Sequence, residues 1–287
     1  MIALTGAGGF IGSVILRHLN DRGITDVYCF DDLPTGDQFK NLVGKKFISL
    51  HSTKEIVTDG QNFDCVIHFG ANSSTLERDW RSIYETNVLS TRRWYDFCRE
   101  NGTKFIFASS AAVYGNGNGP LNHYAFSKMI SEQEIDQAVI LRLFNVYGPN
   151  EYHKGRMAST ILHWFQQLRE TGEFKVFKGS DQYYRDFIYV EDVARTVIHF
   201  IENYSPGIYD LGTGRAESFE TVADALINAY GHGKKNYIDM PKDLRTQYQR
   251  YTCADIGYLK QNAHIDFLDV SQGIQRYLSF LENDQYL

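Results

Sequence analysis

The sequence predicts an α/β protein with a doubly wound parallel sheet and a smaller mixed α/β domain. Short apolar runs typical of buried strands alternate with stretches of helical periodicity from residue 2 to residue 143. A glycine-rich turn separates the first such run from the first helical stretch. Strands joined by helices of this length pair in parallel through right-handed crossovers. A chain of 287 residues is long enough for one large α/β domain with a smaller one attached.

Five strands are expected in the first half of the chain, where they form the most apolar short runs. They are residues 2–5, 26–31, 63–69, 104–109 and 138–143. Apolar residues recur at helical spacing over 12–21, a stretch that ends before Gly23, and again over about 83–97. This order of elements is the basis for the parallel sheet.

After residue 145 the alternation is less regular, which indicates a smaller domain of mixed structure. Helices are expected at about 157–171, 191–203, 217–230 and 269–283, and short strands near Phe174, Phe187 and Ile208. The stretch from 185 to 203 is expected to return to the large sheet. We therefore assign residues 1–144 and 185–204 to the large domain, and residues 145–184 and 205–287 to the smaller one.

The composition is that of an ordinary globular protein, with 43% hydrophobic and 22% charged residues. A net charge of -6 argues against binding to nucleic acid or to an anionic membrane, and no apolar run approaches the ~20 residues that span a bilayer. The four cysteines form no CxxC pair and no signal peptide is visible, so a cytoplasmic location is expected. The nine histidines show no HxxxH or HExxH spacing, so no metal site is expected.

The glycine-rich turn has the features of a dinucleotide site. Gly6, Gly9 and Gly12 form a GxxGxxG pattern that follows a strand and opens a helix, with Phe10 and Ile11 inside it. Such a turn lets the backbone approach a pyrophosphate, and the helix N-terminus directs N–H groups at the negative charge. The spacing differs from the commoner GxGxxG, and a tight turn without a ligand is the alternative.

Two carboxylates at the end of the second strand indicate which dinucleotide binds. Asp31 lies nineteen residues after Gly12, where a carboxylate is expected on the ribose hydroxyls of the adenosine. Asp32 follows it, and two carboxylates there would repel a 2′-phosphate. NAD is therefore expected as the cofactor rather than NADP.

Two further segments are expected near the cofactor. Phe69-Gly70-Ala71-Asn72 follows the third strand and would pass over the bound dinucleotide, and Thr86-Asn87 would line the same groove. For Asn72 the alternative is a loop residue that bonds its own backbone, and for Thr86-Asn87 it is a pair that fixes a helix.

A serine, a tyrosine and a lysine form the candidate catalytic group. Ser110 follows the fourth strand at the end where open α/β sheets place ligands. Tyr124 and Lys128 lie four residues apart, hence on one face of a helix, and a nearby ammonium favours a phenolate that acts as a base. No G-x-S-x-G elbow is present, so Ser110 is not expected to be a nucleophile. The alternatives are a backbone cap for Ser110, a core tyrosine and a surface lysine.

These features resemble the extended short-chain dehydrogenase/reductase superfamily, whose large domain has a Rossmann fold. Segments of the second half resemble more narrowly the ADP-L-glycero-D-manno-heptose 6-epimerases. They are Phe144 to Pro149, His153-Lys154-Gly155, Phe177 to Ser180, Arg185 to Val190 and Leu211 to Phe219. The similarity runs nearly end to end. It implies a homo-oligomer that binds NAD in the large domain and an ADP-sugar in the smaller one.

The resemblance also gives roles to residues that the pattern alone leaves unassigned. Lys154 would act with Tyr124 as one of two bases on the two faces of the sugar carbon, and Val146 would contact the cofactor. The family positions that hold the nucleotide-sugar correspond to Asn145, His163, Phe177, Lys178, Gly179, Ser180, Arg185 and Tyr248. Arg156 stands where the family has a small serine near the substrate, and it is included in the expected substrate site.

The expected function is epimerisation at C6 of an ADP-heptose by transient oxidation and reduction, supplying lipopolysaccharide or another heptose-containing glycan. The segment between Tyr114 and Tyr124 is about ten residues shorter than the family pattern. An epimerase or dehydratase of another nucleotide-diphosphate sugar is therefore an alternative, although Ala111 and Ala112 stand where a dehydratase commonly has an acidic pair. A catalytically silent NAD-binding protein of the same fold is the third hypothesis.

Overall fold

A seven-stranded sheet forms the centre of the larger part of this computed structural model, which describes residues 1–58, 60, 62–241 and 249–287. Its strand order is β10-β6-β5-β4-β1-β2-β3, and every neighbouring pair is parallel. The strands are β1 (Ile2–Thr5), β2 (Val27–Phe30), β3 (Ser49–His51), β4 (Cys65–His68), β5 (Lys104–Ser110), β6 (Val139–Leu143) and β10 (Gly207–Leu211). The predicted α/β fold with a parallel sheet is confirmed.

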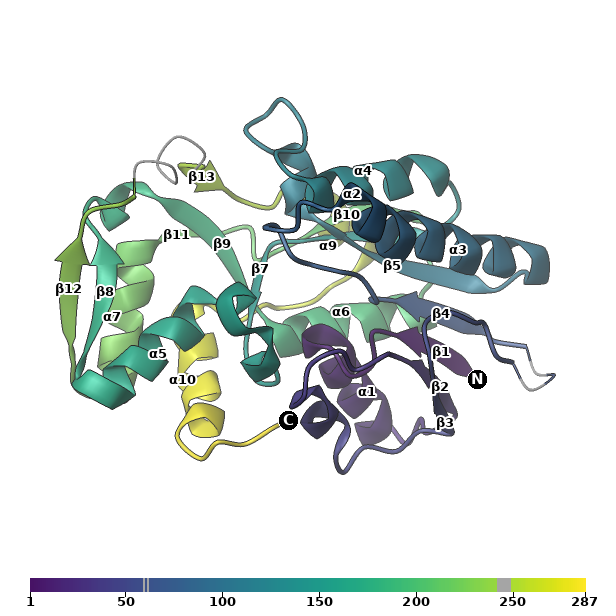
Figure 1. Cartoon of the computed structure of the whole chain (residues 1–287), viewed down its shortest axis with the longest axis horizontal. Helices are drawn as coiled ribbons and strands as arrows, with labels where there is room; N and C mark the ends of the chain where they lie inside the picture. The colour runs from purple at the N-terminus through teal and green to yellow at the C-terminus, as the bar shows by residue number, and fades with distance from the viewer. Residues whose placement is uncertain (59, 61, 242–248) are drawn as a thin grey trace.

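Helices cover both faces of this sheet. They are α1 (Phe10–Asp21), α2 (Trp80–Ile83), α3 (Ser90–Asn101), α4 (His123–Glu134), α6 (Val190–Glu202) and α9 (Gly257–Asn262). Side chains alternate along a strand, so Leu4 packs in a core with α1 and α6, while its neighbour Ala3 packs in a second core with α3. Figure 1 shows α1 and α6 on one side of the sheet and α3 and α4 on the other. Within the described ranges no helix is long and apolar enough to cross a membrane.

The helix predicted through residues 83–97 is interrupted. A π-helical segment, η2 (Tyr84–Leu89), joins α2 to α3. Such segments are frequent at functional sites, because the extra residue re-aims neighbouring side chains. Asn87 lies within this segment and is buried.

The remaining elements build a smaller unit with two short sheets. They are β7 (Asn145–Tyr147), β8 (Glu173–Phe177), β9 (Tyr184–Tyr189), β11 (Ala216–Ser218), β12 (Lys234–Ile238), β13 (Tyr251–Thr252), α5 (Thr160–Thr171), α7 (Phe219–Tyr230) and α10 (Val270–Leu281). β9 is central and pairs with β7, β11 and β13, while β8 and β12 pair with each other. A third apolar core, which includes Trp164 and Tyr277, joins the helices to these sheets.

Two boundaries differ from the sequence prediction. The prediction places β10 in the smaller domain, but β10 is an edge strand of the large sheet, where Gly207 pairs with Val139 of β6. It places β9 in the large domain, but β9 is the central strand of the smaller sheet, and only α6 returns to pack on α1. Apolar residues continue from β9 directly into α6, so periodicity does not show where the chain crosses. The division into two domains stays a prediction.

The carboxyl ends of the central strands meet at one edge of the sheet. Gly6 follows β1, Gly70 lies shortly after β4, and Ser110 ends β5. Ligands of open α/β sheets bind at this edge, so the predicted cofactor and catalytic residues lie where the fold favours a site.

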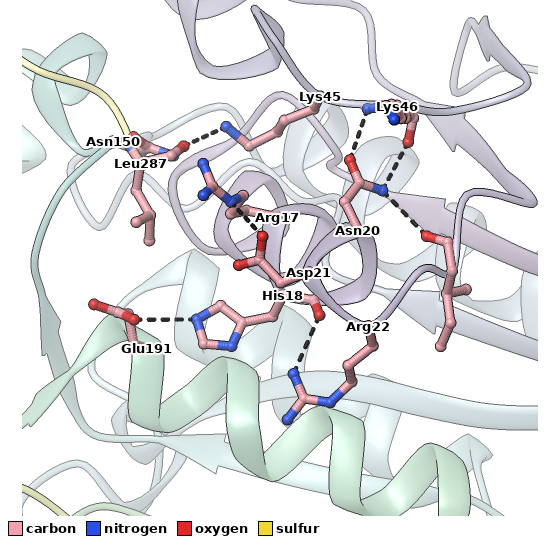
Figure 2. A network of polar contacts seen from close by, with 11 residues as sticks. Arg17, His18, Asn20, Asp21, Arg22, Lys45, Lys46, Asn150, Glu191 and Leu287 are labelled. Atoms are coloured by element: carbon pink, nitrogen blue, oxygen red, sulfur yellow. Dashed lines mark hydrogen bonds and ion pairs between the residues drawn. The ribbon is translucent and has the colours of Figure 1, made fainter.

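The last residues of the chain pack beside α1 and the segment that follows β7 (Figure 2). Leu287 donates its backbone N–H to Asn150 Oδ1 at 2.8 Å and accepts from Asn150 Nδ2 at 3.2 Å, and Lys45 Nζ donates to the same carbonyl. Near the other end of α1, Asn20 Nδ2 donates to the carbonyls of Ile24 and Lys46, at 3.1 and 2.9 Å. Two asparagine side chains thus fasten loops to opposite ends of one helix.

Candidate active site

The glycine turn is shaped by contacts that a side chain would block. Gly6 has a φ of +69°, and a Cβ there would lie 2.7 Å from the backbone N of Gly70. A Cβ on Gly12 would lie 2.1 Å from the carbonyl oxygen of Gly6. Gly9 immediately precedes α1, and no acidic residue occupies the first turn of that helix. The free N–H groups of this helix end are therefore suited to an anionic ligand.

Asp31 lies at the end of β2 beside this turn and is only 9% exposed. Its Oδ2 accepts from the N–H of Gly8 at 2.9 Å, and its Oδ1 accepts from the N–H of Leu33 at 2.8 Å and from Gln38 Nε2 at 3.1 Å. Burial raises the pKa of this carboxyl, against these hydrogen bonds from the backbone. A carboxylate has about four lone-pair sites, so Asp31 can shape the turn and still accept from a ribose hydroxyl.

The carboxylate of Asp32 forms hydrogen bonds with a different segment from Asp31. Its carboxylate accepts from Ser52 Oγ at 2.6 Å and from the N–H of Thr53 at 3.2 Å. Partial burial works against ionisation, but these hydrogen bonds outweigh it and lower the pKa of Asp32. The carboxylate of Asp32 therefore bonds the turn after β3. It adds negative charge near Asp31.

The segment after β4 is organised by hydrogen bonds among buried side chains. Asn87 Oδ1 accepts from the N–H of Asn72 at 2.8 Å, and Asn87 Nδ2 donates to the carbonyl of Asn72 at 3.0 Å and to Ser127 Oγ at 2.9 Å. Asn72 Oδ1 accepts from the N–H of Ser74, so this side chain bonds its own loop. The exposed Thr86 donates to the carbonyl of Ser82 within its helix. Asn87 therefore ties the loop to α4 at Ser127, next to Lys128.

His68 lies beneath this loop, and the sequence did not single it out. Its Nδ1 lies 2.8 Å from Thr5 Oγ1, and its Nε2 lies 3.0 Å from Thr91 Oγ1. Burial, together with the charge of Lys128, lowers the pKa of His68 to about 3. The imidazole is therefore neutral at physiological pH. Because Thr5 Oγ1 also accepts from the N–H of Gly70 at 2.9 Å, His68 supports the contact between the two glycine-bearing turns.

The structure brings Ser110 and Tyr124 together. Their side chains are hydrogen-bonded, and Ser110 Oγ also accepts from the N–H of Ala112 at 3.1 Å, so it caps the turn η3 (Ala111–Tyr114) as well. Burial raises the pKa of Tyr124, and the hydrogen bond with Ser110 opposes that rise. The expected lowering of this pKa is wrong here, because the cost of desolvating the phenolate is the largest effect on it.

Lys128 is 3% exposed, which excludes the alternative of a surface lysine. Its Nζ donates to the carbonyl of Ala108 at 2.7 Å and lies 4.7 Å from the ring centre of Phe107 and 6.0 Å from that of Tyr124. Burial lowers the pKa of Lys128 to about 7, although Glu132 acts in the opposite direction. The amine can therefore gain or lose a proton near neutral pH.

Lys154 approaches the glycine turn from a separate segment, η4 (Tyr152–Met157). Its Nζ lies 5.2 Å from the ring centre of Phe10, the first residue of α1. Burial lowers the pKa of Lys154, and the nearby Glu151 opposes this. The structure thus places a second partly desolvated amine close to the predicted cofactor turn.

The residues expected to hold a nucleotide-sugar fall into two groups. Arg185 is 8% exposed, with Nη1 donating to the carbonyl of Tyr184 at 2.8 Å, and the exposed Asn145 donates to the carbonyl of Asp186 at 3.0 Å. These two lie on the paired strands β9 and β7. Ser180 instead donates to Glu220, and Lys178 pairs with Asp239 at 3.1 Å.

The other residues expected in the substrate site are exposed or half-buried, or lie in a turn. Arg156 is exposed, and in the described part of the chain its guanidinium has neither an ion pair nor a hydrogen bond. His163 on α5, Phe177 at the end of β8 and Val146 in β7 are half-buried, while Gly179 has a φ of +80° before the short turn at Ser180. Tyr248 lies outside the described residues.

Asp186 is a buried carboxylate that sequence reasoning missed. It accepts from the N–H and hydroxyl of Thr213 at 2.8 and 2.7 Å, from the N–H of Gly214 at 2.8 Å and from that of Ala254 at 3.1 Å. It therefore holds two loops of the smaller unit beside Arg185, and its partners are too far apart in sequence to be foreseen.

A family model described as the NAD dependent epimerase/dehydratase family matches residues 2–212. The chain belongs to this family. It is accordingly an enzyme whose cofactor is NAD, which confirms the dinucleotide predicted from the glycine turn and Asp31.

Solved structures similar to this chain include several sugar epimerases. The ADP-L-glycero-D-manno-heptose-6-epimerase of Helicobacter pylori is 28% identical, with a TM-score of 0.88 over 98% of this chain and 96% of that one. The UDP-N-acetylglucosamine 4-epimerase of Methanobrevibacter ruminantium is 23% identical, with a TM-score of 0.85 over 99% and 98%. The UDP-glucuronic acid 4-epimerase of Bacillus cereus is 23% identical, with a TM-score of 0.83 over 99% of both. The latter two share the fold.

The glycine turn fits the cofactor that this family uses. The space that a Cβ on Gly6 or Gly12 would fill is occupied by backbone, so the turn can stay tight and bring N–H groups to a pyrophosphate. Gln38, beside Asp31, is neutral and 5% exposed. The side chain that bonds Asp31 at this position therefore carries no positive charge to bind a 2′-phosphate, in agreement with NAD.

Proposed function

We propose that the protein epimerises an ADP-heptose at C6 by transient oxidation and reduction of that carbon. The observation that carries the proposal is the hydrogen-bonded Ser110–Tyr124 pair over Lys128, together with a second amine, the half-buried Lys154, beside the cofactor turn. The 28% identity to a heptose epimerase, over nearly the whole of both chains, supports the choice of sugar.

NAD, when bound, would accept a hydride from the sugar carbon and return it. Gly6, Gly9 and Gly12 with the start of α1 would hold its pyrophosphate, and Asp31 its ribose. The Gly70–Asn72 loop, fixed by Asn87, would lie along it. In this assignment the large sheet, with α1 and α6, carries the cofactor, and the smaller unit carries the sugar.

Tyr124 would exchange a proton with the hydroxyl at the reacting carbon in one orientation. Ser110, which is hydrogen-bonded to the phenol, would orient that hydroxyl. The ammonium of Lys128 would stabilise the ionised phenol. Its Nζ lies over the ring of Tyr124, 6.0 Å from the ring centre.

Lys154 would exchange a proton with the hydroxyl in the opposite orientation. Epimerisation inverts one carbon, so the hydroxyl must be deprotonated from two directions, and two bases on separate segments meet that need. Burial lowers the pKa of Lys154, which enlarges the fraction of neutral amine able to accept a proton.

Substrate binding is assigned to β7, β9 and the segments next to them. A guanidinium can grip a pyrophosphate bidentately, and Arg185 is buried at the centre of this small sheet. Asn145 and His163 would contact the sugar, and Phe177, Gly179 and Ser180 the nucleotide side. Ser180 donates to Glu220 and Lys178 pairs with Asp239. We therefore expect these two residues to contribute less to substrate binding.

A second candidate is an epimerase of another nucleotide-diphosphate sugar. The exposed Arg156, which has no partner among the described residues and lies two residues after Lys154, would suit a sugar with an additional acidic group. The UDP-glucuronic acid 4-epimerase of Bacillus cereus, whose named substrate is acidic, shares the fold.

The test is NMR of the purified protein with ADP-D-glycero-D-manno-heptose, following the configuration at C6. A mixture of both epimers is expected. If NAD is bound and the sugar is unchanged, while an acidic nucleotide-sugar is converted, the second candidate replaces the first. Tight NAD binding without conversion of any such sugar would favour a silent binding protein.

A further inference from the structure

Asn41 connects the cofactor turn to the segment that carries Lys154. It lies in the turn η1 (Gln38–Leu42) and is fully buried. Its Nδ2 donates to the carbonyl of Gly8 at 2.9 Å and to the carbonyl of Asn150 at 3.1 Å, and lies 3.3 Å from His153 Nδ1. One amide group therefore touches both the glycine turn and the residues just before Lys154.

The chemistry of these contacts requires an amide donor. Both carbonyls only accept, so the assignment of nitrogen and oxygen in the Asn41 side chain is fixed by its partners. The two N–H groups of the amide are directed at these carbonyls, and His153 Nδ1 lies beside them at 3.3 Å. Burial and the charge of Lys154 lower the pKa of His153, while its hydrogen bond with the backbone of Asn150 opposes this.

The other end of the Asn41 amide has no evident structural purpose. Its Oδ1 is buried and has no hydrogen-bond partner in the described part of the chain. A buried polar atom without a partner is destabilising, and an apolar side chain of the same shape would avoid that cost. The donor contacts with the two carbonyls account for an amide at this position.

The segment before Lys154 is held from the opposite side as well. Asn150, with a φ of +75°, donates to Ser13 Oγ at 2.9 Å and bonds the backbone of Leu287 (Figure 2). Tyr152 donates to the carbonyl of Gln285 at 2.9 Å. Asn41 thus adds a direct hydrogen-bonded link between this anchored segment and the glycine turn.

We propose that Asn41 is a positioning residue, which fixes Lys154 relative to the bound cofactor through Gly8, Asn150 and His153. This inference rests on the proposed role of Lys154 as the second base. Asn41 acts through Lys154 and does not itself contact the sugar. A displacement of about 1 Å in a reacting group can lower a rate by about 10²-fold, so loss of this link has a measurable kinetic effect.

The experiment is a double-mutant cycle with Asn41→Leu, Lys154→Ala and the combined variant, assayed with the nucleotide-sugar that the enzyme converts. We expect Asn41→Leu to lower kcat at least about tenfold, with KM and the Kd for NAD within about threefold of the parent enzyme. In the Lys154→Ala background the same substitution should change kcat less than about twofold, because the group that Asn41 positions is already gone.

Asn20→Leu is the matched control. Asn20 also bridges two backbone carbonyls, from a half-buried amide within α1 at the end of the helix away from the glycine turn (Figure 2). It should lower stability and leave kcat close to the parent value. If Asn41→Leu does not fold, His153→Leu removes the contact from the Lys154 side and enters the same cycle.

Two outcomes overturn the inference alone: an equal loss from Asn41→Leu in both backgrounds, or a weakened Kd for NAD with kcat preserved. If Lys154→Ala itself retains full turnover, the proposed two-base function fails, and the inference fails with it. A loss of kcat confined to enzyme that retains Lys154 supports it.

Discussion

The guanidinium of Arg142 and the carboxylate of Glu132 form a bidentate ion pair next to Ser109, the residue before Ser110. Arg142 Nε donates to Glu132 Oε1 at 3.0 Å, and Nη2 donates to Oε2 at 2.6 Å. Ser109 also donates to Glu132, so this carboxylate joins α4 to β5 and β6. Because Tyr124 lies eight residues before Glu132 on the same helix, the pair fixes the helix that carries the phenol.

Glu132→Gln should lower the free energy of unfolding by about 2–3 kcal/mol. Breaking a buried pair costs about 3–5 kcal/mol, and the value is reduced here because the Arg142 side chain is 21% exposed while that of Glu132 is 6% exposed. Urea unfolding with an unchanged m value would measure the loss.

The matched control for this prediction is Glu134→Gln, two residues along the same helix. Glu134 pairs with Arg92, but these side chains are 32% and 41% exposed, so the loss should stay below about 1 kcal/mol. Equal losses from the two substitutions would contradict a special role for Glu132.

The parts of the site that could be predicted are those that depend on residues close together in the sequence. Gly6 and Gly12 follow a strand, Asp31 ends the next strand, and Tyr124 and Lys128 share a helix face, so spacing alone placed them. The alternating apolar runs likewise predicted the large sheet. Some short strands were not predicted. β3 and β13 have three and two residues and are too short to show the alternation of apolar residues typical of a strand.

The parts that could not be predicted depend on partners far apart in the chain. Asn41 contacts residues 33 and 109 positions away, and Asp186 bonds residues 27 and 68 positions away. Local spacing also could not show that burial raises the pKa of Tyr124, against the hydrogen bond with Ser110. A charged Arg142 inside the apolar run of β6 was the one local signal of the ion pair with Glu132.

Tyr124→Phe should lower kcat by about 10²–10⁴-fold, the usual contribution of a general acid or base. The Kd for NAD should stay within about twofold, because the glycine turn and Asp31 are untouched. Steady-state rates and an NAD titration check both statements. Tyr204→Phe is the control, since Tyr204 bonds the backbone of Phe105 and Gln137 away from Ser110; turnover at the parent rate by Tyr124→Phe would remove the phenol from the mechanism.

Arg185→Lys should raise KM for the nucleotide-sugar about tenfold, with a smaller change in kcat. A lysine keeps the positive charge and loses the bidentate geometry, and a hydrogen bond to a charged group contributes about 1.5–3 kcal/mol. Arg169→Lys is the control, because Arg169 forms an exposed pair with Asp284 at 2.9 Å. An unchanged KM for Arg185→Lys would place the pyrophosphate elsewhere.

The buried His68 should make the protein less stable as the pH falls below neutral. Its pKa is lowered from 6.5 to about 3 by burial and by Lys128, so between these values the unfolded chain binds a proton that the folded protein does not. Stability is therefore fully present above pH 6.5 and is lost as the pH falls toward 3. At pH 5 the loss from this one residue is about 2 kcal/mol, from 1.36 kcal/mol for each unit of pKa.

Urea unfolding at pH 7 and pH 5 measures this effect, and His68→Gln isolates it. The variant is expected to be less stable at pH 7, since the hydrogen bonds with Thr5 and Thr91 change, but its stability should fall less between the two pH values. His264→Gln, at an exposed position, should keep the full pH dependence of the parent protein. If His68→Gln loses as much stability on acidification as the parent, the dependence arises from other groups, and the neutral imidazole beneath the glycine turns is not its source.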